Sequence, residues 1–183
     1  MLTNLFRTPL LPDDPDLILA KVGQGARINE LEFYFPMEDF CPSELNGLLK
    51  EWDLPGLPED RLKGFVKGFI DLVFSVDDKF YIVDWKSNFL GRNPDDYLPW
   101  KLKLVMEKEY YVIQYLIYIV ALHRYLKLRM PDYSYEVNFG GVYYVFLRGF
   151  CGSADPRSGF FHDIPPVKLV EELSAVFGGR KSL

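Results

Sequence analysis

The stretch GFIDLVFSVDDKFYIVDWKSN, residues 68–88, contains two apolar, aromatic-rich runs on either side of a polar SVDDK segment. Such runs around a short polar turn predict a β-hairpin, with strands over 62–75 and 79–88. Each run also holds a carboxylate, Asp71 and Asp84, where a buried strand should carry none. These two acids need an explanation beyond the fold.

The expected pairing of the two strands brings the acids together. A two-residue turn at Asp77 and Asp78 places Asp71 opposite Asp84, with Cβ atoms about 4.5–5.5 Å apart. Lys86 lies on the same face as Asp84, two residues further along the strand. Two carboxylates this close repel each other, so either one of them takes up a proton or a cation lies between them.

The chemistry of the acids predicts which cation would fit. Aspartate oxygens are hard ligands that suit Mg²⁺ or Mn²⁺, with water completing an octahedron. Lys86 would then face an attacking water or a phosphate oxygen. Two other interpretations are open: turn residues beside a solvent-facing lysine, or a glycosidase pair, which leaves the lysine without an evident role.

The rest of the chain mixes strand-like and helix-like segments, which predicts an α/β or α+β class. Residues 1–28 look polar and irregular. The other expected elements are a strand over 29–37, a short helix capped by Ser43, a helix in two pieces over 100–129 that ends before Pro131, a strand over 138–150 and an amphipathic helix over 166–177.

Composition limits the functional classes. The 183 residues, 49% of them hydrophobic, suit one domain with a sizeable core. We expect no membrane association, because no run approaches the roughly 20 apolar residues of a membrane span. Cys41 and Cys151 show no pairing pattern, so we expect a reduced, cytoplasmic setting. The net charge of −5 argues mildly against a protein that covers nucleic acid through non-specific charge attraction. The part of the chain beyond residue 60 is nevertheless net basic.

Four blocks in order, KGFIDLVF, YIVDWKSNFLG, QYLIYIVALHRYL and FGGVYYVFLRG, resemble the PD-(D/E)xK nuclease superfamily. Within it they resemble the C-terminal RecB-type nuclease domains of exodeoxyribonuclease V. The resemblance covers about 29–148. It implies a restriction-endonuclease-like core over 29–183, with a mixed central sheet flanked by helices, as a piece of a longer helicase–nuclease polypeptide.

The resemblance also implies roles for the acids of the hairpin. By position, Asp71 and Asp84 correspond to metal-binding carboxylates, and the backbone carbonyl of Trp85 corresponds to a third metal ligand. Lys86 corresponds to the catalytic lysine.

Gln114 and Tyr118 match the Q-x-x-x-Y motif of RecB-type nucleases. Gln114 is also the only amide or charged side chain in VIQYLIYIVAL, where a buried amide needs partners. A family histidine that precedes the first strand has no counterpart, because His123 and His162 both lie downstream. No G-x-x-x-x-G-K-[ST] loop for ATP is present either. We expect the family histidine and the ATP-binding loop both to be missing from this chain if it is part of a longer polypeptide.

The resemblance implies metal-dependent hydrolysis of DNA phosphodiester bonds in double-strand break repair and recombination, with Mg²⁺ as the cofactor and Mn²⁺ as a substitute. The expected partners are single-stranded DNA, the helicase portion of the same longer polypeptide, and RecC- and RecD-like subunits. A noncatalytic docking module is the alternative. The basic residues of the long helices fit a DNA path or a solvated face equally well: Lys101, Lys103, Lys108, Arg124, Lys127 and Arg129.

Overall fold

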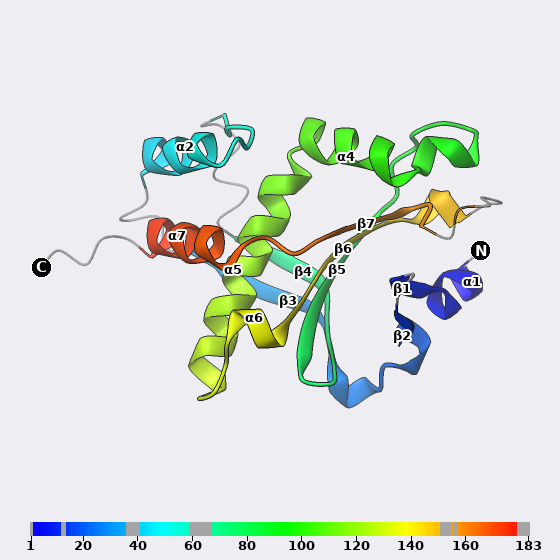
Figure 1. Ribbon diagram of the computed structural model, residues 1–183, viewed down its shortest axis with the longest axis horizontal. Coiled ribbons are helices and arrows are strands. Elements are labelled where there is room, and N and C mark those ends of the chain that lie inside the picture. Colours follow the sequence, from blue (N-terminus) through cyan, green and yellow to red (C-terminus); the bar gives the residue numbers. More distant parts are fainter. Residues whose placement is uncertain are drawn as a thin grey trace, which may run out of the picture.

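The computed structural model describes residues 2–11, 14–35, 41–58, 67–150, 155 and 157–178. Its centre is a five-stranded sheet of order β3-β4-β5-β6-β7, with helices packed against it (Figure 1). β5 and β6 pair in parallel and all other neighbours pair antiparallel. The expected α/β class with a mixed central sheet is therefore confirmed, and this architecture is compatible with a nuclease-like core.

The strands are β1 (Pro9–Leu11), β2 (Asp14–Ile18), β3 (Arg27–Tyr34), β4 (Lys67–Val76), β5 (Lys79–Lys86), β6 (Phe139–Phe146) and β7 (Phe160–Asp163). The α-helices are α1 (Leu2–Arg7), α2 (Pro42–Glu51), α4 (Pro99–Lys108), α5 (Tyr111–Arg129), α6 (Tyr135–Asn138) and α7 (Val167–Phe177), and the 3-10 turns are η1 (Leu19–Lys21), η2 (Gln24–Ala26), η3 (Pro94–Tyr97) and η4 (Leu147–Phe150).

The β4–β5 hairpin has the expected turn and register. Asp77 and Asp78 both have positive φ, 49° and 61°, as a two-residue type I′ turn requires. Aspartate tolerates this left-handed region better than most side chains. The strands then pair from Val76↔Lys79 to Leu72↔Val83. The turn therefore fixes which side chains of the two strands meet on each face.

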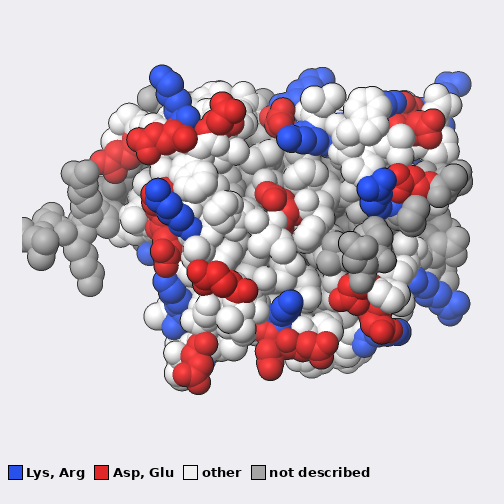
Figure 2. All heavy atoms as spheres, in the orientation of Figure 1, with Lys and Arg blue, Asp and Glu red and all other residues white. Residues whose placement is uncertain are grey.

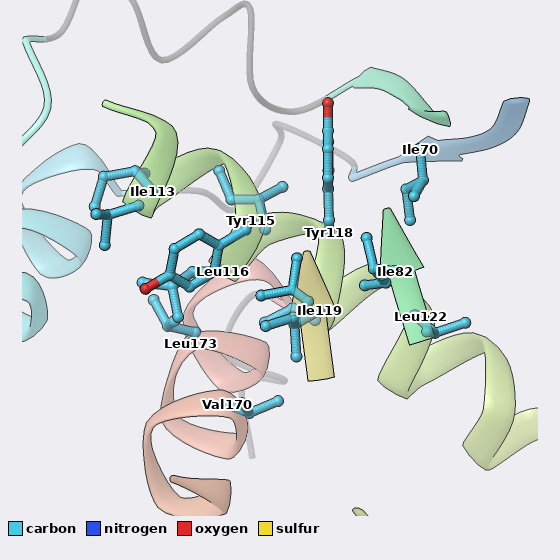
Figure 3. Close-up of a cluster of buried hydrophobic side chains, with 14 of the residues drawn as sticks. Ile70, Ile82, Ile113, Tyr115, Leu116, Tyr118, Ile119, Leu122, Val170 and Leu173 are labelled. Atoms are coloured by element: carbon cyan, nitrogen blue, oxygen red, sulfur yellow. The ribbon is translucent and has the colours of Figure 1, made fainter. Parts of the chain in front are cut away.

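Helices α2, α4, α5 and α7 bury the larger of two hydrophobic clusters, against one face of the sheet. Helix α5 is apolar nearly all round because it lies between the sheet and α7. Figure 3 shows Ile119 of α5 among the side chains of the strands and of α7. Ile70, Ile82 and Leu173 are at most 1% exposed in this cluster.

The opposite face of the sheet is covered by the N-terminal segment. Residues expected to be irregular instead form α1, a two-stranded β1–β2 sheet and two 3-10 turns. Leu5 and Leu17 of this segment pack with Phe74, Val83 and Tyr143 of the central sheet in a second cluster. Elements of three to six residues are too short to show a periodic pattern, so the sequence did not reveal them.

Several boundaries differ from those expected. The helix over 100–129 is indeed divided, at Tyr110, whose φ is 57°, and it ends at Arg129. Ser43 is not the cap of α2, because that helix begins one residue earlier, at Pro42, with Cys41 as its N-cap. Proline is favoured at the first helical position since its φ is already helical. Strand β7 has only four residues and was not predicted from the sequence.

Some expectations fall outside the described residues, namely those for Cys151 and for the first part of the strand predicted over 62–75. Within the described ranges, no helix has both the length and the apolar character that crossing a membrane requires.

Candidate active site

Asp84 is the most buried acid of the β4–β5 hairpin. It lies near the end of β5, is 4% exposed, and its Oδ2 lies 2.7 Å from the Nζ of Lys86. This ion pair is the only polar contact that Oδ2 makes among the described residues. Burial raises the pKa of Asp84 to about 6, although Lys86 opposes the rise, and the nearby charge of Asp71 adds to it. Lys86 is therefore the cation that compensates the buried carboxylate.

Asp71 lies beside Asp84, one residue beyond the regular ladder. The paired residues of β4 and β5 stop at Leu72↔Val83, and the carboxylate of Asp71 accepts a hydrogen bond of 2.9 Å from the backbone N–H of Trp85. On the other side of β4 the ladder also skips Asp71, opposite Glu30, whose φ is 54°. The backbone is thus irregular where the two acids meet.

Lys86 sits between aromatic rings as well as beside the acid. Its Nζ lies 3.9 Å from the ring centroid of Tyr111 and 4.8 Å from that of Tyr144. It also donates a 3.0 Å hydrogen bond to Oε1 of Gln114. The faces of aromatic rings attract cations, so the two rings help to hold the ammonium group in a largely buried position.

Gln114 connects the lysine to two tyrosines. Its Oε1 also accepts a hydrogen bond from the Tyr144 hydroxyl at 2.9 Å, and its Nε2 donates to the Tyr118 hydroxyl at 2.8 Å. The partners that a buried amide requires are therefore present. Burial, followed by the charges of Asp84 and Asp71, raises the pKa of Tyr118, so this hydroxyl stays neutral.

The structure thus gathers the residues singled out in the sequence: Asp71, Asp84, Lys86, Gln114 and Tyr118. It adds two that the sequence analysis missed. Tyr111 begins helix α5, and Tyr144 lies within the apolar run of β6. The parallel pairing of β5 and β6 places Tyr144 directly beside Asp84. The only local sign that Tyr144 belongs to the site was its hydroxyl, within a strand that is buried on both faces.

The oxygen atoms near Asp84 fit a hard divalent cation. Two carboxylates and the backbone carbonyl of Trp85 are the kind of ligand that Mg²⁺ takes, and the buried Oδ2 of Asp84 has only Lys86 as a polar partner among the described residues. The indole of Trp85 packs edge-on against Phe6 with ring centroids 6.2 Å apart, so only its backbone belongs to the site. The described ranges hold no cluster of three or more His, Cys, Asp or Glu residues suited to a metal.

Neither histidine contacts the acids. His123 is 2% exposed on α5, and its Nδ1 shares a 3.2 Å hydrogen bond with the hydroxyl of Tyr133. His162 lies on β7 with its ring 4.5 Å from that of Tyr143. Burial lowers the pKa of both rings, which keeps them neutral. They belong to the packing of the fold.

Three of the basic residues of the long helices contact neighbouring groups of the fold. Lys101 pairs with Asp96 at 2.9 Å, Lys127 lies 3.7 Å from Glu171, and Arg124 donates to a backbone carbonyl of α7. On the face seen in Figure 2, basic and acidic side chains are interspersed. For these three residues, the contacts favour a role in the fold over a DNA path.

No protein-family model matches the chain. The chain is 43% identical over 180 residues to RecBCD enzyme subunit RecB of Haemophilus influenzae, and the match covers 96% of the chain and 15% of that protein. It is 35% identical over 184 residues to the subunit of Escherichia coli, with 97% and 15% covered, and 35% identical over 206 residues to that of Mycolicibacterium smegmatis, with 94% and 19% covered. The resemblance seen in the sequence is confirmed, and the chain spans less than a fifth of these relatives.

Proposed function

Because nearly the whole chain matches a segment of RecB subunits, we propose that it is a metal-dependent DNA nuclease domain of a RecBCD-type enzyme. The observation that carries this proposal is the buried Asp84 carboxylate, 2.7 Å from the Nζ of Lys86 with Asp71 beside it. Taking a charge pair out of water costs several kcal/mol per ion, on the order of the whole stability of a domain. The simplest reason for a protein to retain such a costly pair is that the pair takes part in a reaction.

Each residue of the site has a role in phosphodiester hydrolysis. The oxygens of Asp71, Asp84 and the Trp85 carbonyl would hold Mg²⁺, or Mn²⁺ in its place. When bound, such an ion supplies an activated water and stabilises charge on the phosphate. Lys86 would orient the water or neutralise the charge that develops on the scissile phosphate.

Gln114 and the aromatic rings act on Lys86. The amide oxygen of Gln114 and the rings of Tyr111 and Tyr144 hold the lysine side chain in one position. Tyr118 in turn holds the amide of Gln114 through its hydroxyl. A lysine fixed in this way reaches the transition state without losing side-chain freedom, which is how preorganised electrostatic groups accelerate a reaction.

The proposal extends to the substrate and the partners. A RecB-type role implies DNA repair and recombination, a single-stranded end delivered by a helicase portion of the same polypeptide, and RecC- and RecD-like subunits as neighbours. A noncatalytic docking module is the second candidate. It is favoured by the absence, within the described ranges, of a third acidic or histidine ligand beside the two aspartates.

Degradation of single-stranded and duplex DNA, with Mg²⁺ or with EDTA, tests the proposal. We would compare this chain with a full-length RecB polypeptide that contains it. The Asp84→Asn substitution would be made in both proteins. The expected result is Mg²⁺-dependent degradation of single strands that Asp84→Asn removes, slower in the 183-residue chain because the family histidine is not among its residues. Thermal stabilisation by Mn²⁺ separates the candidates, since a docking module would show neither cleavage nor stabilisation.

A further inference from the structure

A cavity of about 560 Å³ lies next to the candidate active site and is not part of it. It opens where the parallel strands β5 and β6 both end, between Ser87 and the η3 turn on one side and Leu147 and Arg148 on the other. In open sheets, ligands bind in the crevice beyond the carboxyl ends of parallel strands. Its volume lies within the roughly 300–1,000 Å³ of small-ligand sites.

The lining of this cavity combines flat apolar surface with positive charge. Phe89, which is 62% exposed, lines the cavity together with Tyr97 and Leu147. Arg92 and Arg148 contribute two guanidinium groups. Such a combination binds single-stranded nucleic acid, because aromatic faces stack on bases and arginines bind phosphates.

The two arginines are available for an anion. No ion pair among the described residues joins Arg92 or Arg148 to a carboxylate, whereas Lys67, Lys101 and Arg157 each have one. Arg148 is also held in place. Its Nε donates a 3.0 Å hydrogen bond to the carbonyl of Ser87, and its guanidinium carbon lies 5.7 Å from the ring centroid of Phe89.

The cavity is connected to the lysine of the active site. Phe89 follows Lys86 by three residues, which is at most about 11 Å of chain. Between them, Asn88 accepts a 3.2 Å hydrogen bond from the hydroxyl of Tyr111, whose ring lies beside the Nζ of Lys86. A strand with one phosphate at Lys86 would therefore place a neighbouring nucleotide near Phe89.

We propose that this cavity is a nucleotide subsite for the DNA strand being cut: Phe89 stacks on a base next to the scissile phosphate, and Arg148, with Arg92, binds the flanking phosphate. This inference rests on the proposed nuclease function and adds to it the residues that hold the single strand. The contacts are to the π-face of a base and to the backbone, so the subsite is indifferent to sequence.

Binding measurements in EDTA test the subsite without cleavage. The Kd of this chain for a short oligothymidylate and for an abasic oligomer of equal length would be measured by fluorescence anisotropy over a range of salt concentrations. The wild-type chain should prefer the base-containing strand about ten-fold, as one stacked base implies. Phe89→Leu, which keeps an apolar side chain at an exposed position, should abolish this preference and leave the salt dependence unchanged.

Arg148→Gln should change the salt dependence of binding and leave the preference for bases unchanged. It should lower the slope of log Kd against log salt by about 0.7, as loss of one phosphate contact to a single strand does, and keep the preference for bases. Arg129→Gln is the matched control, because Arg129 also lies over an aromatic ring, that of Tyr125 at 4.7 Å, at the far end of α5. It should change neither quantity, and thermal melting would confirm that each variant is folded.

The outcomes separate the two proposals. If the wild-type chain cuts single strands with Mg²⁺ but Phe89→Leu retains the full preference for bases, the subsite is wrong and the nuclease assignment stands. An effect of Arg129→Gln equal to that of Arg148→Gln would likewise overturn the subsite, since binding would then reflect overall charge. If the wild-type chain and the full-length polypeptide neither bind nor cut single strands, both proposals fail.

Discussion

The two faces of strands β5 and β6 are built from very different side chains. On the face toward α5, Asp84, Lys86 and Tyr144 form a polar network with Gln114. On the face toward the N-terminal segment, neighbouring residues such as Val83 pack in an apolar cluster. Residues one position apart in the same strands therefore experience opposite environments, because side chains alternate between the faces.

This difference indicates which face stabilises the fold and which carries the chemistry. The apolar face gains free energy from every buried methylene, roughly 0.8 kcal/mol each. On the polar face, burial raises the pKa of Asp84 to about 6. At neutral pH the buried carboxyl must therefore ionise against this shift, and its ionisation opposes folding. Substitutions on the two faces should separate these two contributions.

Asp84→Asn should reduce Mg²⁺-dependent cleavage of single-stranded DNA by roughly 10³-fold or more, because it removes a charged ligand from the candidate metal site. Single-turnover cleavage by the full-length polypeptide measures this, and circular dichroism in EDTA checks that the variant is folded. Cleavage at the wild-type rate would refute the assignment of the polar face.

Lys86→Met should lower the cleavage rate by about 10²–10³-fold while keeping or strengthening binding of Mn²⁺. A charged lysine cannot be a metal ligand, and its removal leaves the Asp84 carboxylate without a competing cation. Calorimetric titration with Mn²⁺ measures the affinity. If affinity falls in parallel with the rate, Lys86 organises the site and does not act in the reaction.

In EDTA, the free energy of unfolding should fall by about 2 kcal/mol between pH 4 and pH 7 through Asp84 alone. The folded pKa, about 6, lies above the unfolded value of about 3.9, so the folded state binds the proton more tightly and loses this advantage as pH rises. The groups that face the carboxylate include Lys86, Asp71, Tyr118 and Tyr144.

Urea unfolding at a series of pH values measures this contribution, and Asp84→Asn is the control that should lack it. An equal pH dependence in the variant and the wild type would show that Asp84 titrates normally in the folded state.

Val83→Ala, on the apolar face, should reduce the free energy of unfolding by roughly 1–2 kcal/mol, since Val83 is fully buried and its methyl groups leave a cavity. The cleavage rate per folded molecule should stay at the wild-type value. Chemical denaturation and cleavage assays on the same preparation measure both. A rate that falls as far as in Lys86→Met would mean that the two faces are not separate.

The local features of this protein can be predicted from residues that are close together in the chain. The Asp77–Asp78 turn, the register of the hairpin, the position of Lys86 relative to Asp84 and the spacing of Gln114 and Tyr118 along one helix all depend on residues close together in the chain. Turn geometry and the periods of strands and helices fix such relations before any tertiary contact forms.

The surroundings of those residues depend on contacts between distant parts of the chain. Tyr144 reaches the site through the parallel pairing of β5 and β6, which are 60 residues apart at the pair Asp84↔Tyr144. The two carboxylates were expected to repel each other, but each has its own partner. Asp84 pairs with Lys86, and Asp71 accepts a hydrogen bond from the backbone N–H of Trp85. Short N-terminal elements proved to cover a sheet face, because packing and not propensity stabilises them. A sequence pattern shows which groups a strand presents, but the energy of a buried charge depends on neighbours that only the folded chain brings within a few ångströms.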